Sequence, residues 1–273
     1  MSQLALATSS LPIVAQPART ARYPRSLHGK VALVMGGAGA IGAATSRMLA
    51  AAGATIVVTH LPTEGDNQAS QDLVRELGPE VSAAYEADVA STPSLVSLKE
   101  AIEARYGRLD ILVNAAGFTK PVPHGDLDAL TDELVDRMFQ VNWRGQFAAI
   151  RTFAPLLKGS GDGLVVSISS IAAFTGVGSS IAYCAAKAGI DVMTKALARV
   201  LAPEVRVLAV SPGVVDTHFV PGRGADFNDK VGASTPLKRI GEAEDIAAAI
   251  TACATMLGYS TGHTILVDGG RAL

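Results

Sequence analysis

From Lys30 onward, short runs rich in Val, Ile and Thr alternate with longer Ala- and Leu-rich segments of helical periodicity. This alternation is typical of repeated βαβ units. It predicts strands at Val31–Met35, Thr55–Thr59, Val81–Tyr85, Ile111–Val113, Leu164–Ile168, Val205–Val210 and Thr264–Val267. It predicts helices at Ala40–Ala52, Asn67–Leu77, Thr92–Tyr106, Asp132–Leu157, Ala182–Ala202 and Glu242–Met256.

The strand patterns indicate a sheet that is covered on both faces. The run Leu164–Ile168 is continuous rather than alternating, which favours a strand buried between helices. Parallel neighbours require right-handed crossovers, so these elements predict an α/β fold: a single doubly wound, Rossmann-type domain with a seven-stranded parallel sheet and helices on both faces. No internal repeat or long linker divides residues 28–273, which we interpret as one domain. Ligands of such sheets bind at the carboxyl ends of the strands.

Residues 1–27 differ from the rest of the chain. They contain no Asp or Glu, and their apolar residues lack helical periodicity. The positive charges at Arg19, Arg22 and Arg25 follow the apolar stretch rather than precede it, which argues against a secretory signal. We interpret residues 1–27 as a flexible N-terminal extension, with an Arg-rich, acid-poor organellar transit peptide as the alternative.

Composition narrows the class of protein. The 273 residues include 23 Lys and Arg and 25 Asp and Glu, a net charge of −2 that argues against nucleic acid as a partner. Cys184 and Cys253 cannot build a disulfide framework, and no Cys/His cluster has zinc spacing, so we expect a reducing compartment and no metal. No uninterrupted apolar run approaches the ~18 residues of a membrane span. We expect a cytoplasmic protein without membrane partners.

A glycine-rich turn, Gly36–Gly42, joins the first predicted strand to the first helix. Glycines in such a turn permit its tight geometry, allow the backbone to approach a pyrophosphate, and let the helix pack on the strand. The N-terminus of the helix then offers free N–H groups and a partial positive charge to the phosphates. This segment therefore predicts a dinucleotide-binding site.

The end of the second strand bears on which dinucleotide binds. An Asp or Glu at this point usually binds the ribose hydroxyls of NAD, and this chain has His60 instead. No carboxylate there repels a 2′-phosphate, and a partly protonated imidazole attracts one. However, no Arg or Lys stands in the adjacent loop, and Glu64 and Asp66 follow. We expect NADP(H) to be favoured slightly over NAD(H); a solvated loop histidine is the alternative.

A tyrosine and a lysine begin the helix after the fifth strand. Tyr183 and Lys187 are spaced i, i+4 and therefore share one face of that helix. A phenol with a pKa of about 10 is a poor base at neutral pH, but a neighbouring ammonium stabilises the phenolate and lowers that pKa. A surface pair would show the same spacing. Ser170 at the end of the fifth strand and Asn142 on the preceding helix favour the chemical interpretation.

In order and spacing, these motifs resemble those of the short-chain dehydrogenase/reductase family, of the short soluble type and most similar to 3-oxoacyl reductases. The likeness covers about Lys30 to Gly270. Where the family commonly has Thr and Gly in the glycine loop, this chain has Met35 and Ala40, and Met35 lacks a hydroxyl that could tie the loop to its neighbours. The matching motifs are the glycine loop, Asp88, Asn114–Gly117, Asn142, Ser170, Tyr183 with Lys187, Pro212 with Gly213, and Val267–Gly270.

The resemblance implies a role for each matched residue. Tyr183 is expected to be the acid/base, and Ser170 to hold and polarise the substrate carbonyl. Lys187 is expected to lower the tyrosine pKa and bind the nicotinamide ribose, and Asn142 to support a water-linked proton relay through the lysine. The residues expected to bind the cofactor are Gly36, Gly39, Ile41, Gly42, His60, Asp88 (at the adenine ring), Val89, Asn114, Gly117, Tyr183, Lys187, Pro212, Gly213, Val215 and Thr217 (at the nicotinamide amide).

The implied reaction is hydride transfer between a nicotinamide cofactor and a ketone or secondary alcohol. The substrate is expected to be a 3-oxoacyl thioester or another medium-sized carbonyl compound, with a sugar or polyol dehydrogenase of the same family as the alternative. A nucleotide-binding redox sensor without turnover is the alternative from another class. The family also suggests a homotetramer or homodimer with contacts through the helices Asp132–Leu157 and Ala182–Ala202 and the C-terminal segment.

The loop Val214–Ser234 is expected to cover the substrate. We hypothesise that Arg223 or His218 in this loop recognises an acidic or polar tail of the substrate. Additional apolar walls near Ser170 are expected from Phe118, Phe174 and Val177.

Overall fold

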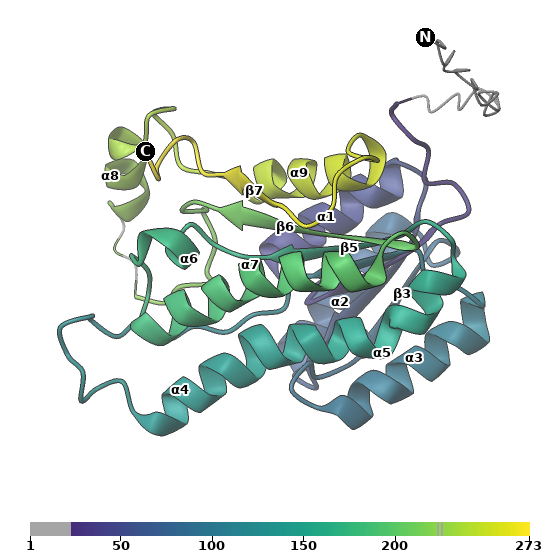
Figure 1. Ribbon diagram of the computed structural model, residues 1–273, viewed down its shortest axis with the longest axis horizontal. Coiled ribbons are helices and arrows are strands. Elements are labelled where there is room, and N and C mark those ends of the chain that lie inside the picture. The colour runs from purple at the N-terminus through teal and green to yellow at the C-terminus, as the bar shows by residue number, and fades with distance from the viewer. Residues whose placement is uncertain (1–22, 223, 225) are drawn as a thin grey trace, which may run out of the picture.

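The computed structural model describes residues 23–222, 224 and 226–273 (Figure 1). The strands in this part of the chain are β1 (Val31–Met35), β2 (Thr55–His60), β3 (Ser82–Glu86), β4 (Ile111–Asn114), β5 (Gly163–Ile168), β6 (Val205–Pro212) and β7 (Thr264–Val267). They form one sheet in the order β3-β2-β1-β4-β5-β6-β7, and every neighbouring pair is parallel. The predicted doubly wound, seven-stranded parallel sheet is confirmed.

Helices cover both faces of the sheet (Figure 1). They are α1 (Ala40–Ala51), α2 (Glu64–Leu77), α3 (Thr92–Tyr106), α4 (Asp132–Phe139), the π-helical segment η1 (Gln140–Gly145), α5 (Gln146–Gly159), α6 (Ala172–Thr175), α7 (Ile181–Leu201), α8 (Phe227–Ser234) and α9 (Ala243–Thr255). None of these helices, all within the described residues, is long and apolar enough to cross a membrane.

Alternate residues of β1 divide between two hydrophobic cores. Val31, Leu33 and Met35 are buried against α3, α5 and α7. Ala32 and Val34 are buried on the opposite face, against α1, α2 and α9. Because both faces of the strand are covered by helices, almost every position must be apolar. This is the physical reason why the strands could be found in the sequence as continuous apolar runs.

The order of the strands reverses at β1, which has β2 on one side and β4 on the other. The loops that follow β1 and β4 therefore diverge from each other. In doubly wound sheets this divergence leaves a crevice at the carboxyl ends of the strands. Both Gly36–Gly42 and the loop that begins at Ala115 lie at this edge.

The predicted helix Asp132–Leu157 is not one continuous α-helix. It consists of α4, the π-helical segment η1 and α5, and α5 contains Pro155 in its interior. A π-helical turn inserts an additional residue into the helix and often marks a functional site. In this chain the insertion contains Asn142, whose side chain is fully buried. Two short helices, α6 and α8, also lie in segments that the sequence indicated only as loops.

Tyr23–Leu27, the described part of the predicted extension, contacts the domain. Leu27 is only 4% exposed and belongs to the core formed by α1, α2 and α9. The Arg25 backbone N–H donates to the carbonyl of Thr255 (2.9 Å), and its guanidinium forms an ion pair with Asp162 (3.1 Å). The packed domain therefore begins before the predicted boundary at residue 28. Residues 1–22 lie outside the described part of the chain.

Candidate active site

A cavity of about 1220 Å³ lies at the carboxyl ends of the strands. Its walls come from the loops after β1, β4, β5 and β6, from the start of α7 and from α8. Residues separated by nearly the whole chain therefore meet around one space, as the fold predicts. The predicted site residues that line it are Gly36, Gly39, Ile41, Gly42, Gly117, Ser170, Tyr183, Lys187, Pro212, Gly213, Val215 and Thr217.

The glycine loop has a geometry that other residues would not permit. Gly36 has φ +75°, and a Cβ atom there would lie 2.8 Å from the Ala116 backbone. A Cβ on Gly42 would lie 2.2 Å from the Gly36 carbonyl oxygen. Within the described residues, no side chain caps the N-terminus of α1 behind Gly39. The first N–H groups of α1 are thus left for a ligand, and they are suited to the phosphates of a dinucleotide.

A hydroxyl from the neighbouring strand β2 holds this loop through a hydrogen bond. Met35 precedes the loop and was expected to leave it without a hydroxyl contact. The structure shows that the Oγ1 of Thr59, at the end of β2, accepts a hydrogen bond from the Gly36 N–H (3.1 Å). The Thr59 side chain is buried beside the Met35 sulfur. β2 therefore supplies the connection that Met35 itself cannot make.

The start of α7 presents Tyr183 and Lys187 to the cavity. The hydroxyl of Ser180 caps this helix by accepting from the Tyr183 N–H (3.1 Å). The Lys187 Nζ donates to the Ile168 carbonyl (2.6 Å) and lies 5.6 Å from the centre of the Tyr183 ring. Burial lowers the pKa of Lys187 to about 8, and the charge of Asp191 acts in the opposite direction. The ammonium is thus held beside the phenol ring by the end of β5.

Ser170 follows the end of β5 and also lines the cavity. Its Oγ accepts from the Ala172 N–H (3.2 Å), which links it to the first turn of α6. The Ile171 N–H donates to the Pro212 carbonyl (3.0 Å) at the end of β6. Two strand ends and α6 therefore fix the backbone on either side of the serine hydroxyl. Together with Tyr183 and Lys187, it forms a set of two hydroxyl groups and one ammonium.

Asn142 lies behind the cavity rather than in its wall. Its Oδ1 accepts from the Phe118 N–H (3.0 Å), and its Nδ2 donates to the carbonyls of Phe118 (2.8 Å) and Met138 (3.0 Å). The carboxamide thus makes the hydrogen bonds to the N–H and C=O of Phe118 that a neighbouring strand would otherwise make, just beyond the end of β4. Asn114, also behind the cavity wall, donates from its Nδ2 to the Ser167 Oγ (3.2 Å) and joins β4 to β5. Both amides support the loop that carries Gly117.

Three residues expected at the adenosine end do not line this cavity. The carboxylate of Asp88 accepts from the Ala90 N–H (2.8 Å), and the Asp88 N–H donates to Ser94 (3.1 Å). Val89 is buried and would contact a Cβ atom on Gly145. His60 ends β2, and its Nδ1 lies 2.8 Å from the Leu61 carbonyl oxygen. His60 is the last residue of β2, the neighbour of β1, and Asp88 and Val89 follow the carboxyl end of β3, the next strand in the sheet.

The apolar walls differ partly from expectation. Val177 and His218 line the cavity, as does Phe219, whose ring lies 6.2 Å from the Tyr183 ring. Phe118 packs on the hydrophobic core instead, and Phe174, in the short helix α6, is 53% exposed and is not among the residues that line the cavity. Arg223 lies outside the described residues.

Arg271, which was not among the residues expected at the site, also lines the cavity, together with Ser234 at the end of the loop expected to cover the substrate. Ser234 ends α8, and its Oγ accepts from the Arg271 guanidinium (3.0 Å). Arg271 directly follows the Val267–Gly270 motif, so a basic residue at that point was the available signal. Its proximity to α8 depends on how the segment after β7 folds back, which periodicity does not reveal.

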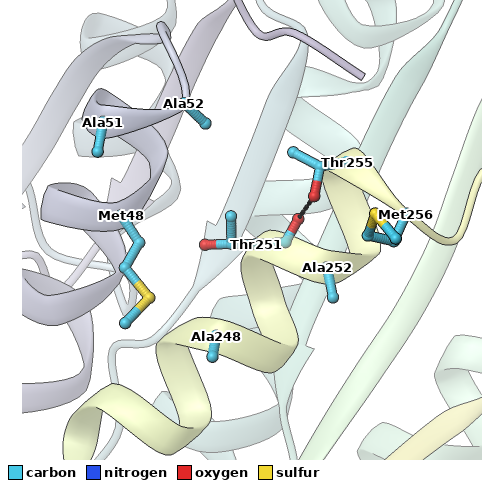
Figure 2. Close-up of a pocket in the computed structure, with 8 residues that line it drawn as sticks. All are labelled: Met48, Ala51, Ala52, Ala248, Thr251, Ala252, Thr255 and Met256. Atoms are coloured by element: carbon cyan, nitrogen blue, oxygen red, sulfur yellow. Dashed lines mark hydrogen bonds between the residues drawn. The ribbon is translucent and has the colours of Figure 1, made fainter. Parts of the chain in front are cut away.

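A second hollow has a different character. A groove of about 500 Å³ lies between α1 and α9 (Figure 2). Its lining residues come from the C-terminal parts of both helices, whereas the glycine loop precedes α1. Its polar groups are two threonines, and the Thr255 hydroxyl donates to the Thr251 carbonyl (2.9 Å). It is lined by Met48, Ala51, Ala52, Ala248, Thr251, Ala252, Thr255 and Met256. None of these residues is charged, and none is a general acid or base. The larger cavity is therefore the candidate active site.

Comparison with known proteins shows which family of proteins the chain resembles. A family model described as enoyl-(acyl carrier protein) reductase matches residues 36–272. The chain is 36% identical to a Streptomyces violaceoruber protein named as a ketoacyl reductase of granaticin polyketide synthase, over 89% of this chain and 96% of that protein. It is 32% identical to the 3-oxoacyl-[acyl-carrier-protein] reductase of Thermotoga maritima, over 90% of this chain and 99% of that protein.

A solved structure has a similar overall fold. The protein is a blue fluorescent protein from a metagenomic library, crystallised in complex with NADPH. It superposes with a TM-score of 0.82 and is 33% identical, and the match covers 91% of this chain and 100% of that one. An identity of 33% supports a shared family as well as a shared fold.

Proposed function

This chain belongs to the short-chain dehydrogenase/reductase family of NAD(P)-dependent oxidoreductases, and we propose that it reduces the ketone of a 3-oxoacyl substrate, with Tyr183 as the proton donor. The observation that carries this proposal is the meeting of Ser170, Tyr183 and Lys187 in one cavity with the glycine loop. Such a set can bind a carbonyl oxygen and protonate it while a nicotinamide lies alongside.

The residues present fit a nicotinamide dinucleotide. The uncapped start of α1 and the close-fitting glycines suit the pyrophosphate, while Gly213 and Thr217 line the same cavity as Tyr183. When bound in its reduced form, the cofactor supplies a hydride to the carbonyl carbon. The protein's part is to hold the carbonyl in place and to supply the proton that converts the oxygen to a hydroxyl.

Each polar residue then has a separate task. The Tyr183 O–H donates its proton to the carbonyl oxygen as negative charge develops there, and the Ser170 hydroxyl donates a hydrogen bond to the same oxygen. The tyrosine is left as a phenolate, which the Lys187 ammonium stabilises. Asn142 acts on this proposal as a positioning residue, because its carboxamide is engaged by Phe118 and Met138.

For the cofactor we propose NADPH, with a modest preference over NADH. His60 stands at the end of β2, where a carboxylate would repel the 2′-phosphate of NADPH. The similar solved structure that binds NADPH is consistent with this choice. The nearby acidic residues Glu64 and Asp66, in the first turn of α2, limit the size of the preference.

An acyl substrate fits the cavity better than a sugar. The described lining residues include no Asp, Glu, Asn or Gln, which a site for a polyol would use to bind several hydroxyls. Aliphatic and aromatic side chains such as Val177, Phe219 and Val220 line it, beside serine and threonine hydroxyls. The relatives named as ketoacyl or 3-oxoacyl reductases support the same class.

The proposal is tested by measuring kcat/KM with NADPH and NADH against 3-oxoacyl thioesters, simple ketones and ketoses. We expect the thioester with NADPH to give the highest value. In the Tyr183→Phe variant, kcat should fall by about 10² to 10⁴, because only the proton donor is removed. NADPH binding, followed by calorimetry, should be retained. Tyr259→Phe is the matched control, since Tyr259 is fully exposed.

The other outcomes would each contradict a stated part of the proposal. Equal turnover by the wild type and Tyr183→Phe would exclude Tyr183 as the proton donor. A ketose as the best substrate would favour the polyol dehydrogenase. NADPH binding without turnover of any compound would favour the redox sensor.

A further inference from the structure

We infer that Arg271 is a specificity-determining residue that binds an anionic group of the substrate, remote from the carbonyl that is reduced. The inference rests on the proposed reductase function and adds a substrate class to it. It starts from the position of Arg271 in the wall of the large cavity, beside Ser234 at the end of α8. The hypothesis based on the sequence placed this role on Arg223 or His218 instead.

The segment after β7 is built as a tight turn. The Asp268 carboxylate accepts from the N–H groups of Gly270 (2.9 Å) and Ala272 (2.8 Å), on either side of Arg271. The Arg271 N–H donates to the Asp268 carbonyl (3.1 Å). Gly269 and Gly270 have φ +64° and +84°, which glycine adopts without strain. The backbone that carries Arg271 is thus held from both sides.

The same turn is attached to the region that closes the cavity. The Leu237 N–H donates to the Gly269 carbonyl (3.1 Å), and a Cβ atom on Gly269 would lie 2.8 Å from the Thr235 methyl group. Figure 1 shows the C-terminal end of the chain beside α8. Both ends of α8, at Phe227 and Ser234, line the cavity together with Arg271. The guanidinium therefore lies on the α8 side of the cavity, next to the last residue of the loop Val214–Ser234.

Arg271 has a charge that the described protein does not neutralise. None of the ion pairs among the described residues involves it, and its guanidinium partner is the neutral Ser234 hydroxyl (3.0 Å). The only other Lys or Arg in the described lining is Lys187, which is engaged with Ile168 beside Tyr183. No described Asp or Glu lines the cavity, so the formal charges of its described lining are all positive.

A guanidinium is suited to bind a carboxylate or a phosphate through two parallel hydrogen bonds. Two kinds of 3-oxoacyl substrate carry such a group away from the ketone: an acyl chain that ends in a carboxylate, and a thioester whose thiol portion carries a phosphate. Both present the same anionic chemistry to Arg271. They differ in which end of the substrate points toward α8.

Two substrate pairs, each differing by one anionic group, distinguish these sources. The first pair is the monomethyl and dimethyl esters of a 3-oxo dicarboxylic acid, with the free carboxylate at the end remote from the ketone. The second pair is a 3-oxoacyl phosphopantetheine and the corresponding 3-oxoacyl pantetheine. For each pair, the ratio of kcat/KM for the charged over the neutral member is measured in the wild type, Arg271→Ala, Arg271→Lys and Ser234→Ala.

We expect Arg271→Ala to reduce this ratio by about 10- to 100-fold for at least one pair, through KM, because a hydrogen bond between charged groups is lost. Arg271→Lys should retain the charge preference in part, and Ser234→Ala should weaken it less than Arg271→Ala. Arg75→Ala is the matched control, because this arginine is 71% exposed on α2. A fall confined to the first pair identifies a carboxylate, and a fall confined to the second identifies a phosphate.

An unchanged ratio for both pairs in Arg271→Ala would overturn the inference. So would a raised KM for NADPH with the substrate ratios unchanged, since Arg271 would then serve the cofactor. Failure of the reductase proposal looks different: the wild type would turn over neither member of either pair. The two ideas can therefore be rejected separately.

Discussion

At Lys187, burial disfavours the charged form of the side chain, while the nearby charge of Asp191 favours it. The Lys187 side chain is 3% exposed, and its Nζ donates to the Ile168 carbonyl at the end of β5. Burial lowers its pKa from 10.5 to about 8. At neutral pH the group is still an ammonium, as the proposed mechanism requires, but the folded protein has to bury that charge.

This burial predicts a pH dependence of stability. Between about pH 8 and 10.5, the unfolded chain keeps the Lys187 proton while the folded chain loses it, so the free energy of unfolding rises with pH. The shift corresponds to about 3 kcal/mol. Lys187→Met removes this contribution. We expect its stability relative to the wild type, measured by urea denaturation, to be greatest near pH 7 and to decline by up to this amount by pH 10.5. A difference that is constant with pH would contradict the assigned burial cost.

At the scale of the elements, the π-helical segment η1 carries the residue that supports the loop after β4. Periodicity predicts one helix across Asp132–Leu157, because apolar residues recur at helical spacing on both sides of η1. The inserted turn contains Asn142, whose carboxamide forms hydrogen bonds with the backbone N–H and C=O of Phe118. A contact between residues 24 positions apart in the chain cannot be read from local spacing.

Asn142→Ala tests this connection. The change leaves the Phe118 N–H and C=O without their side-chain partner in a buried environment, so we expect a loss of about 2–4 kcal/mol in the free energy of unfolding. Asn67→Ala, at an exposed position of α2, is the control and should cost far less. Equal losses in the two variants, measured by urea denaturation, would show that the carboxamide bonds do not support the loop.

At the scale of the whole molecule, α7 has two faces. One face carries Tyr183 and Lys187 to the cavity, and the other exposes Val192 and Val200, each 66% exposed. These valines are eight residues apart, so they lie on the same side of the helix. Apolar residues repeated on an exposed helix face favour contact with another protein surface.

The predicted homodimer or homotetramer would use this face of α7. We expect light scattering to give a mass two or four times the 28.0 kDa of the chain. Replacing both Val192 and Val200 with Glu should reduce that mass, because two buried charges would oppose association. Val96→Glu, at an exposed position of α3, should not change the mass. A monomeric wild type would refute the predicted assembly.

Much of this protein was determined by its sequence alone. Strands buried on both faces must be apolar, so their number, order along the chain and parallel pairing followed from the pattern. Gly36 and Gly42 could be recognised in the sequence because the turn requires glycine there, since any side chain would collide with backbone atoms. Tyr183 and Lys187 were recognisable because a helix places residues four apart on one face.

Only the tertiary structure decided the features that depend on distant contacts. It showed that Thr59 accepts a hydrogen bond from the glycine loop, that Phe174 does not line the cavity, and that the chain packs on the domain from before residue 28. It also placed Arg271 beside Ser234. Periodicity describes which side of an element is apolar, whereas these contacts join segments far apart in the chain. The packing of the whole domain sets where such segments meet.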